Sequence, residues 1–239
     1  MCGRYTLISK PDALSTLLRI DVGAMLPPRY NIAPTQSVPV LRNIDGQLRL
    51  DHLTWGFIPS WAKSPAIGPR LINARSETAA TKPAFRAAMR ERRCLIPASG
   101  FYEWKREGLK KQPFYIRRRD GRPFVFAGLW TVWTGENGEQ IESSTILTTL
   151  PNEMIRQIHD RMPVILDERG WDTWLHPVEQ DLKHVVALLA PTPTDNLDIY
   201  PVSPRVNSVV NDDASCIEPV SLAPAEPHED RDHEQPSLF

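Results

Sequence analysis

The sequence predicts an α+β fold built around an antiparallel sheet or an open barrel. Three observations lead to this prediction. Stretches rich in β-branched and aromatic residues outnumber the helical ones, turn dipeptides of the hairpin type stand between them, and helical segments are interspersed along the whole chain. With 239 residues, the chain is long enough for one sizeable core.

The expected strands combine β-branched or aromatic residues with turn residues at their ends. They cover residues 38–42, 48–58, 94–97, 113–118, 124–133, 143–149 and 162–166. Asp45-Gly46 marks a turn, and Asp120-Gly121 and Asn137-Gly138 are expected hairpin tips. Hairpins imply antiparallel pairing.

The expected helices are fewer. They cover residues 11–19, 76–92, 152–159, 167–175 and 179–189. Ser9 and Pro11 start the first of these, and in the second Pro83 is expected to mark the true first turn.

Charge is unevenly distributed although the net charge is −1. Residues 86–119 carry eleven Lys or Arg against three Glu, which suits either a solvated face or contacts with phosphate. Residues 225–239 carry five acidic residues and one Arg. We therefore expect one domain over residues 1–222 and a disordered acidic tail over 223–239.

The longest apolar runs are too short to span a membrane, so no membrane association is expected. The first ten residues lack the apolar core of a secretory signal, which predicts a cytoplasmic or nucleoid location. Cys2, Cys94 and Cys216 have no metal-binding spacing, and neither a metal nor a cofactor is expected. Cys94 lies in an apolar run and is expected to be a buried core thiol.

Cys2 is the most reactive candidate. Aminopeptidase removal of Met1 would leave an α-amine and a thiol on one residue. The amine, with a reference pKa near ~8, can form a Schiff base with an aldehyde, and the thiol can then close a thiazolidine ring. The alternative is an incidental cysteine after the initiator.

Three further motifs carry polar residues that could converge on a site. In residues 71–78, Asn73 could hold an amine and Arg75 could bind a phosphate, although this segment could instead cap a helix. Glu103 lies among aromatic residues, which would raise its pKa, unless it faces solvent. His159 follows a helical segment and could carry a proton, with Arg161 on a phosphate, or it could simply end the helix.

Aromatic residues beside polar groups could stack on unpaired bases. Of the seven Trp, Trp61 and Trp104 are expected to contact a ligand, and the others are expected in the core.

Seven motifs in order resemble the SRAP family, the SOS-response-associated peptidases, also called abasic-site processing proteins. They are MCGRY, RYNIAP, WGFIPSWA, LINARSET, GFYEWK, HDRMP and VSPRVNSVVND, and the resemblance runs from Cys2 to about Val220. It implies a single α+β domain around an antiparallel β-barrel-like core with peripheral helices. It also implies that the partner is single-stranded DNA that contains abasic sites, including strand–duplex junctions, and that a monomer binds it during the DNA damage response.

The resemblance further implies roles for individual residues. Cys2 would link to the ring-opened aldehyde, Asn73 would orient its amine, Glu103 would assist proton transfers and His159 would protonate the sugar ring oxygen. Phosphate contacts are implied for Arg4, Arg75 and Arg161, with Thr148 and Trp104 as helpers, and a surface that displaces or stacks bases is implied for Asn31, Pro34 and Trp61.

Two other functions stay open at this point. One is a cysteine peptidase or amidohydrolase that uses Cys2 as nucleophile with His159 and Glu103. The other is a non-covalent single-strand binding module. Strand cleavage by a lyase reaction is a further possible activity of the capture scheme.

Overall fold

In a computed structural model, described over residues 2–23, 26–108, 110–176 and 182–222, five strands close into a barrel. Strand β10 closes it because it pairs with β9 on one side and with β4 on the other. The barrel strands are β3 (Ser37–Ile44), β4 (Gln47–Trp55), β6 (Arg93–Ala98), β9 (Phe124–Thr134) and β10 (Gln140–Thr149). The α+β class and the barrel-like core predicted above are confirmed.

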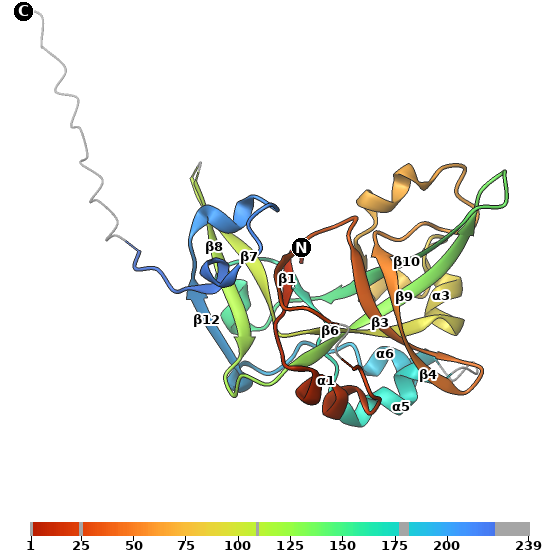
Figure 1. Ribbon diagram of the computed structural model, residues 1–239, viewed down its shortest axis with the longest axis horizontal. Coiled ribbons are helices and arrows are strands. Elements are labelled where there is room, and N and C mark those ends of the chain that lie inside the picture. The colour runs from red at the N-terminus through yellow and green to blue at the C-terminus, as the bar shows by residue number, and fades with distance from the viewer. Residues whose placement is uncertain (1, 24–25, 109, 177–181, 223–239) are drawn as a thin grey trace, which may run out of the picture.

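A second sheet of five antiparallel strands lies beside the barrel (Figure 1). Its order is β12 (Leu197–Pro201), β8 (Lys110–Arg118), β7 (Gly100–Glu107), β1 (Tyr5–Leu7) and β2 (Arg29–Ile32). In Figure 1 the N-terminal end of β1 lies between the two halves of the molecule. Tyr5 joins them, since its ring packs edge-on against Trp55 at 5.3 Å and Phe126 at 5.8 Å.

Two short strands extend the barrel at the end of β10. β5 (Asn73–Arg75) runs parallel to β10, and β11 (Met162–Pro163) runs antiparallel to it. Because Thr148 pairs with both Arg75 and Pro163, the segments around residues 73 and 162 meet at one place. The β4–β10 and β5–β10 pairs are parallel, so the pairing is less uniformly antiparallel than the hairpin signals indicate.

Short helices surround the sheets. They are α1 (Pro11–Leu18), α2 (Ser76–Ala79), α3 (Arg86–Glu91), α4 (Glu153–Arg156), α5 (Trp171–Leu175) and α6 (Leu182–Ala187). The 3-10 turns are η1 (Pro65–Arg70), η2 (Glu168–Gly170), η3 (Thr194–Asn196), η4 (Pro204–Asn207) and η5 (Ala214–Ile217). None of the helices in the described ranges has the length and apolar character to span a membrane.

Some boundaries differ from those expected. Residues 76–92 form two helices instead of one, because turns at Thr81 and Phe85 separate α2 from α3, and Pro83 precedes α3 without belonging to it. Asn137-Gly138 joins the β9–β10 hairpin as predicted. Asp120-Gly121 does not form a hairpin, since β8 and β9 belong to different sheets. The tail over 223–239 and residues 179–181 of the last expected helix lie outside the described residues.

Candidate active site

Cys2 lies just before β1 and is fully buried. Burial raises the pKa of its thiol well above the ordinary range, and the nearby charge of Glu103 adds to this. Sγ lies 4.0 Å from the carbonyl oxygen of Arg4. The thiol is therefore held in its protonated form beside a carboxyl group.

Glu103 reaches the same place from the neighbouring strand β7, whose Phe101 pairs with Tyr5 of β1. Its side chain is 2% exposed, so the alternative in which Glu103 faces solvent is wrong. Desolvation raises the pKa of this carboxyl to about 7, and the negative charge of Asp160 acts in the same direction. A carboxyl with this pKa can both hold and release a proton near neutral pH.

His159 approaches Glu103 from the turn after α4. Its Nε2 lies 3.8 Å from Glu103 Oε2, and its Nδ1 accepts a 3.0 Å hydrogen bond from the backbone N–H of Arg161. Burial lowers the pKa of the imidazole below its ordinary value. The same Nδ1 lies 2.9 Å from Asp160 Oδ1, whose negative charge acts against this lowering, while Nε2 points toward Glu103. The backbone N–H of His159 also closes the turn on Ile155, so the residue serves the helix end as well.

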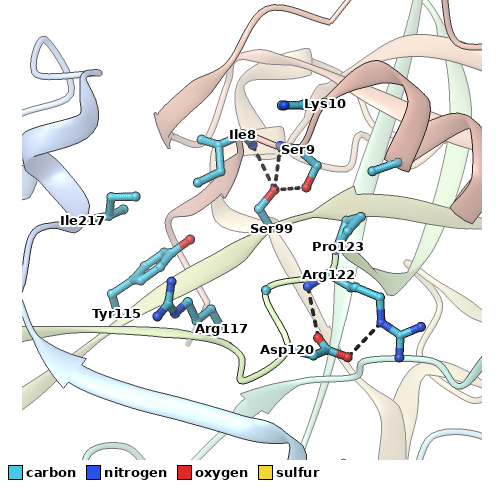
Figure 2. Close-up of a pocket in the computed structure, with 12 residues that line it drawn as sticks. Ile8, Ser9, Lys10, Ser99, Tyr115, Arg117, Asp120, Arg122, Pro123 and Ile217 are labelled. Carbon is cyan, nitrogen blue, oxygen red and sulfur yellow. Dashed lines mark hydrogen bonds and ion pairs between the residues drawn. The ribbon is translucent and has the colours of Figure 1, made fainter.

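Glu103 and His159 open onto a pocket of about 460 Å³, whereas Cys2 lies buried behind them and does not line it. Its lining consists of Glu103, Trp104, Arg106, Lys111, His159 and Asn207. Another pocket, of about 370 Å³, lies between the start of α1 and the turn after β8 (Figure 2). There Ser99 Oγ accepts hydrogen bonds from the backbone of Ile8 and Ser9, and none of the residues proposed for the site lines it.

Asn73 stands on β5 beside the end of β10. Its Nδ2 donates to the backbone oxygen of Ile72 at 3.0 Å. Its Oδ1 is buried and has no hydrogen-bond partner among the described residues. Because an unsatisfied buried acceptor is costly, this oxygen is suited to receive an amine hydrogen.

Arg161 is buried and its guanidinium is already engaged. It donates to both carboxylate oxygens of Glu77, at 2.6 and 2.9 Å, and to the backbone oxygen of Thr148 at 2.6 Å. The same contact holds the pKa of Glu77 below its usual range. A phosphate contact by Arg161 would therefore require exchange with Glu77, and it stays a prediction. Arg75, on the neighbouring strand, is exposed.

Arg4 and Asn31 form a structural link to the loop over residues 203–213. Arg4 donates to Asn31 Oδ1 at 2.9 Å and to the backbone oxygen of Val206 at 2.8 Å. Asn31 is fully buried, and its Nδ2 donates to backbone oxygens of Val206, Ser208 and Asn211. Asn31 thus lies beneath this loop instead of on the base-contacting surface expected for it, because its amide satisfies buried carbonyls.

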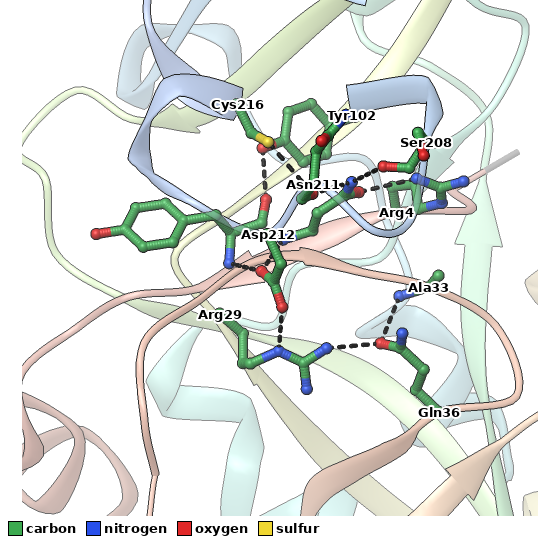
Figure 3. Close-up of polar contacts among 11 residues, drawn as sticks. Arg4, Arg29, Ala33, Gln36, Tyr102, Ser208, Asn211, Asp212 and Cys216 are labelled. Atoms are coloured by element: carbon green, nitrogen blue, oxygen red, sulfur yellow. Dashed lines mark hydrogen bonds and ion pairs between the residues drawn. The ribbon is translucent and has the colours of Figure 1, made fainter. Parts of the chain in front are cut away.

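Asp212 fastens the other end of this loop to β2. Its Oδ1 accepts the backbone N–H groups of Tyr30 at 2.5 Å and Asn31 at 2.8 Å, and its Oδ2 accepts from Arg29 (Figure 3). We expect Asp212→Ala to lower the free energy of unfolding by about 1–3 kcal/mol, because buried backbone donors lose their acceptor. Urea denaturation measures this. Asp172→Ala, which removes a carboxylate that is 90% exposed, is the control and should change little; equal losses in both variants would contradict this role for Asp212.

The aromatic candidates differ in exposure. Trp61 is 61% exposed, as a stacking residue needs to be, and Pro34 is half-buried. Trp104 is half-buried and donates from Nε1 to Asn207 Oδ1 at 2.8 Å. Trp55 and Trp174 are fully buried, as expected of core tryptophans.

Sequence reasoning missed Asn207, Arg106 and Lys111, which line the pocket. Asn207 lies within the last quoted motif, so a signal was present. Arg106 and Lys111 belong to no quoted motif. Both lie in the basic stretch 86–119, and their pairing across the β7–β8 hairpin brings them together. No group of three His, Cys, Asp or Glu side chains able to hold a metal occurs in the part of the chain that the structure describes.

Comparison with known proteins adds the following. The family model for the SOS response associated peptidases (SRAP) matches residues 1–209. The abasic site processing protein YoqW of Bacillus subtilis is 43% identical over 224 residues, which cover 91% of this chain and 99% of that protein. The abasic site processing protein YedK of Escherichia coli is 34% identical over 227 residues, which cover 92% and 100%.

The same name is carried by a more distant relative. The abasic site processing protein HMCES of Gallus gallus is 32% identical over 82% of this chain and 67% of that protein. Among solved structures, a protein from Bacteroides thetaiotaomicron superposes with a TM-score of 0.80 at 26% identity, covering 92% of this chain and all of the other. One from Bordetella bronchiseptica gives a TM-score of 0.73 at 27% identity, covering 84% and 100%.

Proposed function

This chain belongs to the SOS response-associated peptidase (SRAP) family, and from that membership we propose that it captures abasic sites in single-stranded DNA through Cys2. The abasic site as substrate is taken from the names of the relatives, which are called abasic site processing proteins. The observation that carries the chemistry is a fully buried Cys2 beside a carboxyl of pKa about 7 and a histidine 3.8 Å from that carboxyl. We place this activity, carried out by a monomer, in the cytoplasm.

The reaction begins once Met1 has been removed. The neutral α-amine of Cys2 attacks the aldehyde carbon of the ring-opened sugar, and loss of one water gives the imine. The thiol sulfur then adds to the imine carbon while the thiol proton is transferred, in net terms, to the nitrogen. A carbon–sulfur bond forms, the carbon–nitrogen double bond becomes single, and the product is a five-membered thiazolidine.

Each polar neighbour has a task in this scheme. Because the thiol is held protonated, its proton must be taken up as sulfur attacks, and the carboxylate of Glu103 can take it near neutral pH. His159 delivers a proton to the sugar ring oxygen from its protonated imidazolium form and becomes neutral. The protonated carboxyl of Glu103, whose Oε2 lies 3.8 Å from Nε2, returns a proton to it through a bridging water. Asn73 Oδ1 receives a hydrogen of the amine and so directs the nitrogen lone pair to the aldehyde.

The same observations argue against a cysteine peptidase. Such an enzyme needs a thiolate that a protonated histidine stabilises, and its thiol pKa is low. Here the pKa of the Cys2 thiol is raised and the pKa of His159 is lowered, while His159 faces Glu103. A thiol kept neutral until an imine forms suits ring closure better than attack on a peptide.

The experiment uses two strands of the same sequence. One carries a single abasic site, and the other carries its tetrahydrofuran analogue, which has no aldehyde. We expect a heat-stable protein–DNA adduct with the first strand and none with the second, read on a denaturing gel. An adduct with both strands, or with neither, would overturn the proposal.

A further inference from the structure

Two cations face each other across the β7–β8 hairpin at the mouth of the pocket. Arg106 on β7 stands directly opposite Lys111 on β8, and both side chains are exposed. Directly opposed side chains of an antiparallel pair have Cβ atoms only ~5 Å apart, and like charges in that arrangement repel. The hairpin therefore carries an unfavourable pair of like charges at the mouth of the pocket.

The two cations make no direct polar contact within the described chain. Neither the guanidinium of Arg106 nor the ammonium of Lys111 has a hydrogen bond or an ion pair with any residue that the structure describes. Neighbouring Lys110, by contrast, stands in register opposite an acidic residue, Glu107. The neighbouring residue pair of the hairpin thus combines an acidic and a basic residue in register, whereas the pair at the pocket combines two basic residues.

The pair shares its pocket with the reacting groups. Arg106 and Lys111 line the same pocket of about 460 Å³ as Glu103, His159 and Asn207. Burial is the main reason that the pKa of His159 is low, and the positive charge of Arg106 also contributes, so the guanidinium lies within electrostatic reach of the imidazole. An anion bound between the two cations would lie next to the sugar that His159 and Glu103 act upon.

We propose that Arg106 and Lys111 together bind one backbone phosphate of the single strand, next to the nucleotide that Cys2 captures. This inference rests on the proposed function and adds to it a phosphate-binding subsite for the substrate. A phosphodiester supplies one negative charge and two free oxygens, so each cation can donate to its own oxygen. Binding relieves the repulsion across the hairpin and holds the sugar over the pocket.

The test measures equilibrium binding of the full chain to the strand with the tetrahydrofuran analogue, which cannot react. For single strands, each phosphate contact adds about 0.7 to the slope of log K against log salt concentration. The variants are Arg106→Gln, Lys111→Gln and the double change, with Lys110→Gln as a control of equal charge on the same hairpin. We expect the double variant to lose about 0.7 from the slope and about tenfold in affinity at low salt. The control should keep the wild-type slope.

Neutral methylphosphonate linkages, introduced one at a time, locate the contact. At one linkage beside the analogue, the wild-type protein should lose about tenfold in affinity while the double variant loses nothing further. Equal slopes in wild type and double variant, or an equal loss in the Lys110 control, would overturn the subsite. Failure of covalent capture is seen separately, as absence of an adduct between wild-type protein and the aldehyde-bearing strand.

Discussion

Cys2→Ser is expected to abolish the heat-stable adduct with abasic single-stranded DNA. The serine variant keeps an α-amine and can still form an imine with the aldehyde. An alcohol is a far weaker nucleophile than a thiol, so the ring does not close and the imine hydrolyses on heating. Borohydride added before heating should therefore recover an adduct from this variant by reducing the imine to an amine.

The control for this variant is Cys94→Ala, which removes a thiol buried in the barrel. Its adduct yield should equal that of the wild type at a temperature where both are folded. An unchanged heat-stable yield from Cys2→Ser would rule out the thiazolidine.

Glu103→Gln is expected to slow adduct formation by a factor on the order of 10²–10⁴, the usual contribution of a positioned acid–base group. Because the carboxylate is the base, the wild-type rate should rise with pH through about 7, the pKa of Glu103. The variant should lack the inflection near pH 7, since an amide does not titrate, and should keep only the rise due to the α-amine, whose reference pKa is about 8. Rates from pH 5.5 to 8.5, on a strand that wild type and variant bind equally, test this directly.

The same carboxyl should make the protein less stable at higher pH. Its pKa is about 7 in the fold against 4.5 for the ordinary group, so between these values the folded state binds more protons than the unfolded state. The contribution of Glu103 to the free energy of unfolding is therefore fully present below pH 4.5 and is lost as the pH rises through about 7. At pH 8, Glu103→Gln should be more stable than the wild type by on the order of 2–3 kcal/mol, and at pH 4.5 the gain should vanish.

Urea denaturation at the two pH values separates an acid–base role from a structural one. A variant that is slower and also less stable at both pH values would mean that Glu103 mainly supports the fold. The predicted combination, slower but more stable at pH 8, is the signature of a carboxyl kept in a costly environment for its chemistry.

The sequence predicts those parts of the fold that depend on neighbouring residues. Asn137-Gly138 indicates the β9–β10 hairpin because its backbone preference is a property of two adjacent residues. Asp120-Gly121 carries the same signal, yet the strands on either side enter different sheets, which only the packing of the whole chain decides. The parallel pairing of β5 with β10 joins residues more than seventy positions apart and has no local signature.

The site shows the same limit. Cys2, Glu103 and His159 could be proposed as candidates because the residue type and the immediate neighbours of each indicate its chemistry. Asn31 and Arg161 could be identified as candidate site residues, but the surroundings of their side chains could not be predicted. Their polar groups are taken by distant carbonyls and by Glu77, and no spacing along the chain encodes those partners.

The most direct test of the account is the chemical structure of the adduct at the N-terminal residue. After nuclease and protease digestion of the purified adduct, mass spectrometry of the peptide that begins at Cys2 gives the attached sugar remnant, and iodoacetamide reports any free thiol. The account predicts a peptide without Met1 that carries the remnant on Cys2, resists borohydride and is not alkylated, because nitrogen and sulfur share one carbon. A remnant on a lysine, or a Cys2 whose thiol is alkylated while the remnant stays attached, would contradict it.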